Sequence, residues 1–370
     1  MRITQIVASI ERRHGGPSQS VTALSQSLAE IGQDVTLLAT AATPRVSMGD
    51  LSIHVFHCAW PQQITRSPRL NSFLRFHPAE YIHHHGLWLR TLHYAARAAK
   101  SQQISLIISP RGMMSPWAWN HHRSQKIFAD RFIHPGALRG ATGWHATSDS
   151  EADDIRALGF QQPICVSPNG VILPSGTDQE KATNHWHSIC PATKERRVAL
   201  FYGRFHRKKR VLELIELWAT LPAAQWLLLI VGIPEEYTVA DLQNYVINSK
   251  LQGRVVVFDG TDRPPPYAIA SLFLLPSHSE NFGLTVAESL VHGVPALVTD
   301  TTPWQEMSKQ EAGWCVQWID FSKTLKRVLT ESQESLASRG SRGREWAEKT
   351  FSWTRSAKIL VEFYTSLKAK

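Results

Sequence analysis

Two glutamates eight positions apart, Glu280 and Glu288, stand in the stretch whose residue pattern carries the most chemistry. An apolar run ends before a polar loop that carries Glu280, and a helix is predicted over about 284–292 until Gly293 ends it. A second apolar run follows, so the pattern predicts strand, loop, helix and strand. The loop would deliver a carboxylate and a helix N-terminus to one place. Because the predicted helix is apolar nearly all round, Glu288 should be buried and needs a partner that offsets its desolvation.

The spacing of these glutamates resembles the Glu-x7-Glu signature of retaining glycosyltransferases of family 4. Pro-Ser precedes the signature at 276–277, Asn-Phe-Gly lies inside it at 281–283, and Gly-Val-Pro follows it at 293–295. The resemblance extends over the rest of the chain and is closest to enzymes of bacterial polysaccharide or lipopolysaccharide biosynthesis. It implies an α/β protein with the GT-B fold, in which two Rossmann-like domains with parallel sheets face each other.

The resemblance also implies a role for each residue of the signature. Glu288 would accept hydrogen bonds from the two ribose hydroxyls of a nucleotide, as strand-end acids do in dinucleotide sites. Glu280 would contact a hydroxyl of the donor sugar, and neither glutamate would act as a nucleophile. The backbone amides at the positive end of the helix would face the sugar or its diphosphate; they belong to Asn281, Phe282, Gly283 and Leu284. Two purely structural carboxylates are the alternative.

A cationic loop at 203–209 follows one predicted strand and precedes a helix, so its cations project from the carboxyl end of that strand. Arg204 and Lys209 match the arginine and lysine with which the family binds the diphosphate, and Gly203 opens the loop. Stabilising the negative charge of a departing diphosphate is the main electrostatic task of such a transfer. A merely solvated loop is the alternative. Arg210 stands where the family usually has glycine.

Three residues of the first half are further candidates. Gly16 lies between the first strand and the first helix, where a missing Cβ lets backbone amides approach a phosphate; an ordinary turn is the alternative. His85 ends a histidine triplet that resembles the exit of the family's fourth strand. It is the best acceptor-side or sugar-contacting candidate, unless it is a buried, hydrogen-bonded histidine. Arg111 follows the next strand, where many members of the family have histidine. Because arginine does not shuttle protons at neutral pH, its expected role is electrostatic.

No metal site and no cofactor are expected, and the nucleotide sugar is a substrate. Neighbours in the triplet 83–85 alternate between the two faces of a strand, so the three cannot converge on one ion, and no acid or cysteine completes the set. The chain shows no Asp-x-Asp in a strand-end loop. Its four cysteines lie scattered without a Cys-x-x-Cys pair, which favours neither zinc nor disulfides.

The length of 370 residues exceeds what one core usually supports, and two series of alternating strands and helices are predicted. We expect an N-terminal Rossmann-like, acceptor-side domain over 1–172 and a nucleotide-sugar-binding domain over 197–350. The Pro-, Gly- and polar-rich stretch 173–196 is interpreted as a linker between them. By resemblance, a C-terminal helix over 351–370 would cross back to the first domain.

The formal charge of +9 is concentrated in residues 61–140, where eleven Arg and Lys face only Glu80 and Asp130. A solvated basic surface, a surface for anionic lipid or a pyrophosphate-linked acceptor, and a nucleic-acid surface are the three interpretations. The last is disfavoured because no nucleic-acid-binding motif accompanies the charge. No apolar run is long enough to cross a membrane, and the N-terminus opens directly into a strand pattern. A cytoplasmic protein is expected, and peripheral association with an anionic inner membrane stays open.

We therefore expect a retaining, metal-independent glycosyltransferase that moves a sugar from a UDP- or GDP-sugar to a saccharide or lipid-linked acceptor in lipopolysaccharide, capsule or exopolysaccharide assembly. Two alternatives stay open. A GT-B sugar-nucleotide epimerase would arrange its catalytic acids differently. A catalytically inactive GT-B binding scaffold would have no need to keep the glutamates together with Arg204 and Lys209.

Overall fold

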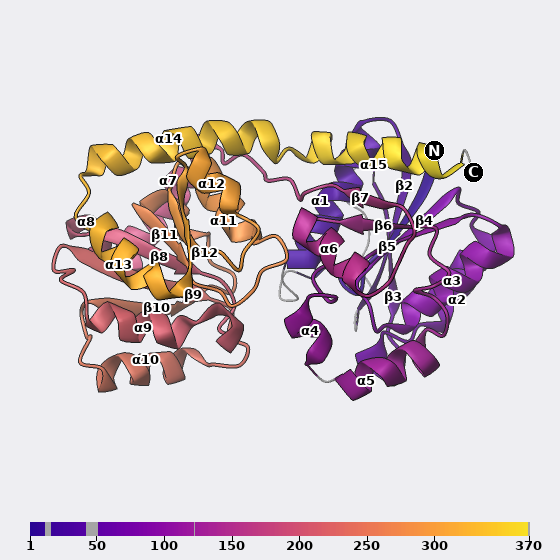
Figure 1. Ribbon diagram of the computed structural model, residues 1–370, viewed down its shortest axis with the longest axis horizontal. Helices are drawn as coiled ribbons and strands as arrows, with labels where there is room; N and C mark the ends of the chain where they lie inside the picture. The colour runs from indigo at the N-terminus through magenta and orange to yellow at the C-terminus, as the bar shows by residue number, and fades with distance from the viewer. Residues whose placement is uncertain (12–15, 42–50, 122, 369–370) are drawn as a thin grey trace. The chain divides into compact units, whose positions relative to one another are not determined.

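The computed structural model describes residues 1–11, 16–41, 51–121 and 123–368, which form two compact α/β units (Figure 1). The first unit contains residues up to Gly170 and the C-terminal residues from Ser352 onward. The second unit is Val171–Phe351. Each unit has a single parallel sheet, so the two Rossmann-like halves expected of the GT-B fold are present.

The first sheet has the strand order β3-β2-β1-β4-β5-β6-β7, with every neighbouring pair parallel. Its strands are β1 Arg2–Ile6, β2 Asp34–Ala41, β3 Ser52–His57, β4 Tyr81–His85, β5 Ser105–Ser109, β6 Gly143–Ala146 and β7 Ile164–Val166. Its helices are α1 Gly16–Glu30, α2 Pro68–Phe76, α3 Arg90–Gln102, α4 Pro116–Asn120, α5 Arg123–Phe128, the π-helix η3 Ala129–Ile133, α6 Asp149–Ala157 and α15 Trp353–Lys368. The strand order reverses between β1 and β4, which is where open α/β sheets bind ligands.

The second sheet has the order β10-β9-β8-β11-β12-β13 and is also parallel throughout. Its strands are β8 Arg197–Tyr202, β9 Trp226–Gly232, β10 Val255–Asp259, β11 Leu272–Leu275, β12 Ala296–Thr299 and β13 Gly313–Val316. Its helices are α7 Gly176–Ile189, α8 Ala192–Glu195, α9 Val211–Ala219, α10 Val239–Asn248, α11 Leu284–Val291, α12 Gln305–Lys309, α13 Trp318–Val328 and α14 Gln333–Thr350, with short 3₁₀ turns η4 Arg207–Lys209 and η5 Pro266–Ile269. The strand order reverses between β8 and β11.

Both faces of the second sheet are buried at its central strands, which explains why β8, β9, β11 and β12 are mostly continuous apolar runs. All seven residues of β9 are buried. Along β8, Ala199 and Phe201 join the core on one face, whereas Val198 and Leu200 join the core on the other. In the first unit, Ile6 and Ile3 of β1 divide between two cores in the same way. In the second sheet this layering leaves the polar residues of the site to the loops at the ends of the strands, whereas the first sheet also buries polar residues within its strands, such as Gln5 and His85.

The stretch 173–196 is not a linker, contrary to the sequence interpretation. It forms α7 and α8 and belongs to the second unit. The Ser175 side chain caps α7 by accepting from the amide of Asp178. Trp186 is fully buried in the core and donates from Nε1 to the carbonyl of Pro264 at 2.9 Å. The polar composition reflects the solvated faces of a helix that is anchored by one buried stripe.

The C-terminal helix α15 packs against α1 within the first unit. Its buried residues Leu360 and Tyr364 lie in the core that also contains Leu24 and Leu28 of α1. Ser356 donates to the carbonyl of Pro168 at 2.6 Å. None of the helices in the described residues is both long enough and apolar enough to pass through a bilayer.

Candidate functional site

The loop after β11 lies at the reversal of the second sheet, and its glycine fixes the start of α11. Gly283 has φ of 76°, the left-handed conformation that favours glycine. A Cβ at Gly283 would lie 3.1 Å from Nε1 of Trp304, which itself donates to the carbonyl of Phe282 at 2.6 Å. Phe282 is buried, whereas Asn281 and Leu284 are half-buried. The four residues expected at the start of the helix therefore form a compact turn held by Trp304.

Glu280 and Lys209 form an ion pair across the two central loops of this sheet. Lys209 Nζ lies 2.5 Å from Glu280 Oε1, and the side chains are only 13% and 10% exposed. Burial alone would raise the pKa of Glu280, but Lys209 and Lys208 hold that pKa below its ordinary value. Glu280 is therefore ionised at neutral pH, and Lys209 is fixed at the carboxyl end of β8.

Backbone contacts join the same two loops. The amide of His278 donates to the carbonyl of Lys208 at 2.8 Å, and Arg210 Nε donates to His278 Nε2 at 3.2 Å. Arg210 has φ of 52°, so it adopts the conformation that glycine takes most readily. The loops after β8 and β11 thus form one structural unit at the reversal of the strand order.

Arg204 lies on the exposed side of the joined loops after β8 and β11. Its Nη1 contacts Glu235 Oε1 at 2.7 Å, with the two side chains 49% and 38% exposed. An exposed pair of this kind contributes little stability and is free to exchange partners. Burial lowers the pKa of Lys208, and the positive charges of Lys209 and Arg204 act in the same direction against the opposing effect of Glu280. Lys208 is therefore a third cation of this site, which the sequence analysis passed over although it adjoins Lys209.

Gly203 is half-buried and leads from β8 into the cationic loop. A Cβ on Gly203 would meet nothing within 4 Å, whereas a Cβ on Gly232 would lie 1.8 Å from the Gly203 carbonyl oxygen. The strict requirement for glycine therefore falls on Gly232, which allows the ends of β8 and β9 to approach. Gly203 itself faces open space.

Glu288 lies on α11 and has a different environment from Glu280. Tyr267 donates from its hydroxyl to Glu288 Oε2 at 2.7 Å. Burial raises the pKa of Glu288 to about 7, although the Tyr267 hydrogen bond acts against that rise. The residue is half-buried rather than fully buried, while five other residues of the helix are buried as expected. Tyr267 is the partner that the sequence required but did not identify, because η5 lies about twenty residues away along the chain.

In the first unit, His85 ends β4 beside the reversal of the strand order, and Arg111 follows β5. Arg111 donates from Nε and Nη2 to His85 Nδ1 at 3.2 and 3.0 Å. It also donates from Nη1 to Asn169 Oδ1 at 2.8 Å. Burial lowers the pKa of Arg111 to about 10, so it stays charged at neutral pH. The structure thus brings His85 and Arg111 together, and it adds Asn169, which the sequence analysis did not single out.

Gly16 is the first residue of α1 and is exposed, with nothing within 4 Å of a Cβ built on it. Its neighbour in the sequence, Gly15, lies outside the described residues. The open space at Gly16 is compatible with a close approach by a ligand, and its role in phosphate binding stays a prediction.

The histidine triplet divides as its strand position requires. His84 points to one face, where it contacts the Gly86 carbonyl and Thr91. His83 and His85 share the other face with His145 of β6, and one ring nitrogen of each of these three lies within 4.8 Å of the others. Convergence of three histidines was not expected, because His145 is remote in sequence. The set fits a metal ion poorly, since the Arg111 cation donates to the Nδ1 lone pair of His85.

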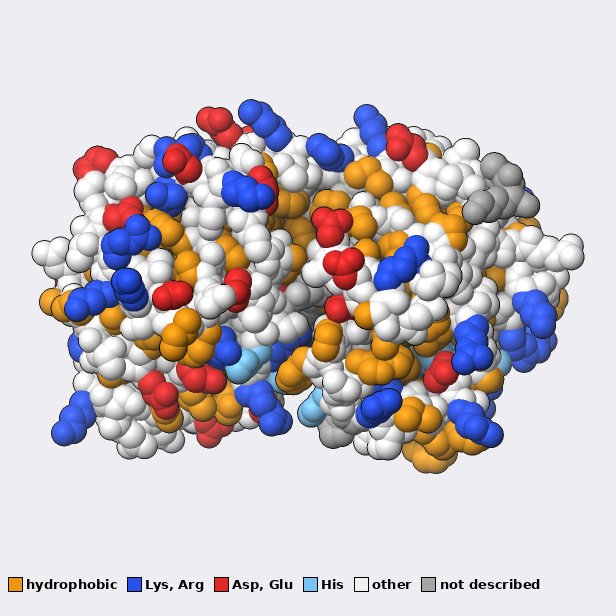
Figure 2. Space-filling model, in the orientation of Figure 1, with side chains coloured by type: hydrophobic (Ala, Val, Ile, Leu, Met, Phe, Trp, Pro, Cys, Tyr) orange, Lys and Arg blue, Asp and Glu red, His pale blue; other side chains and the backbone are white. Residues whose placement is uncertain are grey.

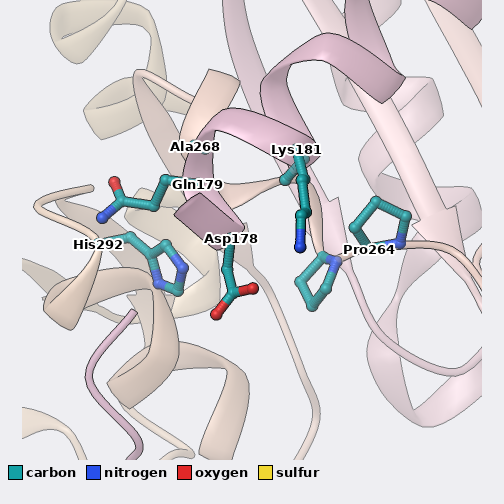
Figure 3. Close-up of a pocket in the computed structure, with 8 residues that line it drawn as sticks. Asp178, Gln179, Lys181, Pro264, Ala268 and His292 are labelled. Carbon is teal, nitrogen blue, oxygen red and sulfur yellow. The ribbon is translucent and has the colours of Figure 1, made fainter. Parts of the chain in front are cut away.

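A pocket in the second unit lies at the other end of α11, where His292 caps the helix (Figure 3). Its lining residues are Asp178, Gln179, Lys181, Ala182, Pro264, Pro265, Ala268 and His292. None of these residues belongs to the predicted site. The pocket therefore gives no independent support to that site.

Known proteins connect these features to one class, the GT-B glycosyltransferases. Residues 15–170 match the family described as glycosyl transferase 4-like domain, and residues 184–346 match glycosyl transferases group 1. The solved structure of Anabaena Alr3699/HepE in complex with UDP and glucose superimposes with a TM-score of 0.77 and 16% identity, covering 99% of this chain and 100% of that one. The chain belongs to the family 4 glycosyltransferases, and the expected fold is confirmed.

Two curated relatives are similar over parts of the chain. The lipopolysaccharide core biosynthesis mannosyltransferase LpsB of Rhizobium meliloti (strain 1021) is 26% identical over 134 residues, covering 35% of this chain and 38% of the relative. The GDP-mannose:cellobiosyl-diphosphopolyprenol alpha-mannosyltransferase of Komagataeibacter xylinus is 25% identical over 219 residues, covering 53% of each. The matches thus span only 38% and 53% of the relatives' own lengths.

Proposed function

We propose that this protein is a retaining glycosyltransferase that transfers a sugar from a UDP- or GDP-sugar to a saccharide or lipid-linked acceptor. The pathway that we propose is the assembly of lipopolysaccharide, capsule or exopolysaccharide. The observation that carries the proposal is the largely buried Lys209–Glu280 ion pair just before α11, with Glu288 on that helix. A carboxylate that a lysine keeps ionised is suited to accept from a sugar hydroxyl.

The donor classes are those named for similar proteins. Alr3699/HepE was solved with UDP and glucose, and the Komagataeibacter relative is named for GDP-mannose. In the second unit of this chain, Glu288 would accept from the ribose hydroxyls that both nucleotides share. The proposal therefore keeps both bases and leaves the sugar open.

The proposed chemistry breaks the bond between the anomeric carbon and a phosphate oxygen while the acceptor hydroxyl attacks from the same face. The transition state is oxocarbenium-like, and the acceptor proton passes to the departing phosphate oxygen. Arg204, Lys208 and Lys209 would stabilise the charge that grows on the diphosphate. Glu280 would hold the donor sugar by one of its hydroxyls.

Metal independence is part of the proposal. A divalent ion in such reactions neutralises the leaving diphosphate, and here the loop after β8 supplies cationic side chains for that task. We expect activity to survive chelation.

Association with an anionic membrane surface is proposed for the first unit. Four hydrophobic side chains on α4, α5 and η3 are 39–59% exposed: Trp117, Ile127, Phe128 and Phe132. Arg123 and Arg131 on the same segment are exposed. Figure 2 shows hydrophobic side chains between Lys and Arg side chains over the end of the first unit that carries α5. Exposed apolar side chains with cationic side chains beside them suit the headgroup layer of an anionic bilayer.

The test measures thermal stabilisation by a panel of UDP- and GDP-sugars, followed by transfer to saccharide and lipid-linked acceptors with and without EDTA. Lys209→Met should cost about 2–4 kcal/mol of transition-state stabilisation, measured as a fall in kcat/KM. Lys309→Met is the matched control, because Lys309 forms an exposed ion pair with Glu306 in the same unit. Wild-type turnover by Lys209→Met would contradict the site. Loss of activity on chelation, restored by magnesium, would contradict metal independence, and a product of inverted anomeric configuration would contradict retention.

A further inference from the structure

A buried chain of hydrogen bonds runs from Arg111 through His85 and Gln5 to Tyr364 of the C-terminal helix. His85 Nε2 lies 2.6 Å from Gln5 Oε1, and Gln5 Nε2 lies 3.4 Å from the Tyr364 hydroxyl. That hydroxyl lies 2.6 Å from His83 Nδ1. Gln5 and Tyr364 are 0% exposed, and His85 is 2% exposed. Residues of β1, β4 and α15 thereby share one polar network inside the core of the first unit.

The direction of each bond follows from Arg111, which can only donate. Because Arg111 donates to His85 Nδ1, that nitrogen carries no proton, and the proton of the neutral ring lies on Nε2. Nε2 donates to the Gln5 amide oxygen, which leaves the Gln5 amide nitrogen to donate to Tyr364. Tyr364 then donates its one proton to His83 Nδ1. One obligate donor thus fixes the tautomer of His85 and the amide orientation of Gln5.

The network leaves His85 without a nitrogen for substrate. Both ring nitrogens are engaged within the protein, and desolvation together with neighbouring positive charge lowers the pKa of His85 well below its ordinary value. The titratable and charged groups that act on it are His83 and His84 of β4, Arg111, and His145 of β6. Tyr364 joins them through Gln5, and its own pKa is raised by burial. The neutral imidazole is therefore a fixed acceptor that orients the Arg111 guanidinium, with Asn169 holding the other side of that group.

We propose that Gln5 and Tyr364 are positioning residues of the transfer reaction, which hold His85 in the tautomer that orients Arg111 toward the substrate. This inference rests on the proposed function. It assigns the C-terminal helix a part in the active site, because Tyr364 is its contribution to the network. A metal ion on His83, His85 and His145 is the competing use of the same cluster. It would either take the His85 Nδ1 lone pair that accepts from Arg111 or, if bound at Nε2, put the ring proton on Nδ1, where it would oppose the Arg111 donors.

The first measurement is independent of activity. Long-range proton–nitrogen NMR on histidine-labelled protein, with His85→Gln for assignment, reports which ring nitrogen carries the proton. We expect the Nε2-protonated neutral form of His85 from pH 6 to 8. An Nδ1-protonated ring, or stoichiometric Zn²⁺ binding that disappears in His85→Gln, would overturn the proposal even if transfer activity is found.

The second measurement is the pH profile of kcat for two variants. Gln5→Glu places a carboxylate beside His85 Nε2 and favours the imidazolium, which cannot accept from Arg111. Its kcat should therefore fall by about fivefold or more from pH 8 to pH 6, a decline that the wild type lacks. Tyr364→Phe should lower kcat by about tenfold with an unchanged KM for the nucleotide sugar. An unaltered pH profile in Gln5→Glu would refute the positioning role.

Tyr94→Phe is the matched control for the loss of a hydroxyl. Tyr94 is buried in the same unit, and its hydroxyl makes no hydrogen bond among the described residues. Its kcat should equal that of the wild type, so an equal loss in Tyr94→Phe and Tyr364→Phe would contradict the proposal. Absence of transfer in the wild type, with the NMR result as expected, would instead count against the proposed function.

Discussion

Two glutamates of one loop and helix differ in charge state because their neighbours differ. Glu280 is closed in by Lys209 and Lys208, so its pKa lies below the ordinary value despite burial. Glu288 accepts a hydrogen bond from the Tyr267 hydroxyl and has no lysine beside it among the described residues, and burial raises its pKa to about 7. Glu280, paired with Lys209, is ionised at neutral pH and can only accept hydrogen bonds, whereas Glu288 changes its charge near that pH. That difference makes Glu288 the residue through which pH should act on donor binding.

We predict that nucleotide-sugar affinity tightens as the pH rises through about 7. Deprotonated Glu288 accepts charge-assisted hydrogen bonds from the ribose hydroxyls, which are stronger than those to the protonated acid. The pKa of Glu280 is lowered, and burial lowers that of His292, so both lie outside this window. Calorimetric titration with a nucleotide sugar, whose diphosphate does not titrate near pH 7, measures the effect. Glu288→Gln should bind more weakly and without pH dependence; the same pH dependence in this variant would exclude Glu288 as its source.

The pKa of Glu288 also has a consequence for stability. Because the folded pKa is raised above that of an unfolded glutamate, its contribution to stability is present at low pH and is lost as the pH rises toward 7. The free protein therefore holds Glu288 at a cost near neutral pH. A ligand that donates hydrogen bonds to the ionised form would offset this cost.

At the scale of elements, α11 is bounded by two glycines with nearly the same backbone conformation. Gly283 has φ of 76° and Gly293 has φ of 74°. A Cβ at Gly293 meets nothing within 4 Å, whereas one at Gly283 meets Trp304 Nε1 at 3.1 Å. An alanine at Gly293 would meet only the cost of the left-handed backbone. An alanine at Gly283 would meet that cost and also displace the loop that carries Glu280.

We predict that Gly293→Ala lowers the free energy of unfolding by about 1 kcal/mol and leaves kcat/KM nearly unchanged. Gly283→Ala should cost more than that in stability and lower kcat/KM about tenfold or more, because displacement of Trp304 or Phe282 shifts the start of α11. Denaturant unfolding and steady-state kinetics on both variants provide the comparison. If the two variants behave alike, the contact between Gly283 and Trp304 has no influence on the site.

The sequence predicted elements wherever local pattern decides them. The helices α11 and α15 lie within a few residues of their expected positions, and the predicted strand and helix on either side of the 203–209 loop are β8 and α9. Residues 173–196 were misread because the polar surface residues outnumber the buried ones, of which Trp186 is the largest. Lys209 and Glu280 were both expected in the site, and the structure pairs them. Gln5, His145 and Tyr364 could not be found, because their partners lie on other strands and helices and no local spacing marks the network.

At the scale of the whole molecule, charge and exposed apolar surface coincide in one segment. Residues 61–140 hold a positive excess equal to the formal charge of the entire chain, +9. The exposed Phe128 and Phe132 lie within this segment, with ring centroids 4.9 Å apart. Hydrophobic insertion and attraction to anionic lipid would act on the same surface, each adding to the other.

We predict weak, salt-sensitive binding of the protein to vesicles that contain anionic lipid, because charge attraction is screened over about 8 Å at physiological ionic strength. Replacing both phenylalanines, Phe128→Ser with Phe132→Ser, should reduce co-sedimentation severalfold at low salt by removing the inserting rings. Ile319→Ser is the matched control, since Ile319 is 82% exposed in the second unit, outside the basic segment. Equal partitioning onto neutral and anionic vesicles, or no binding at low salt, would show that the basic segment serves a soluble glycan acceptor or is only solvated charge. Equal losses in the double variant and in Ile319→Ser would show that binding does not depend on α5 and η3.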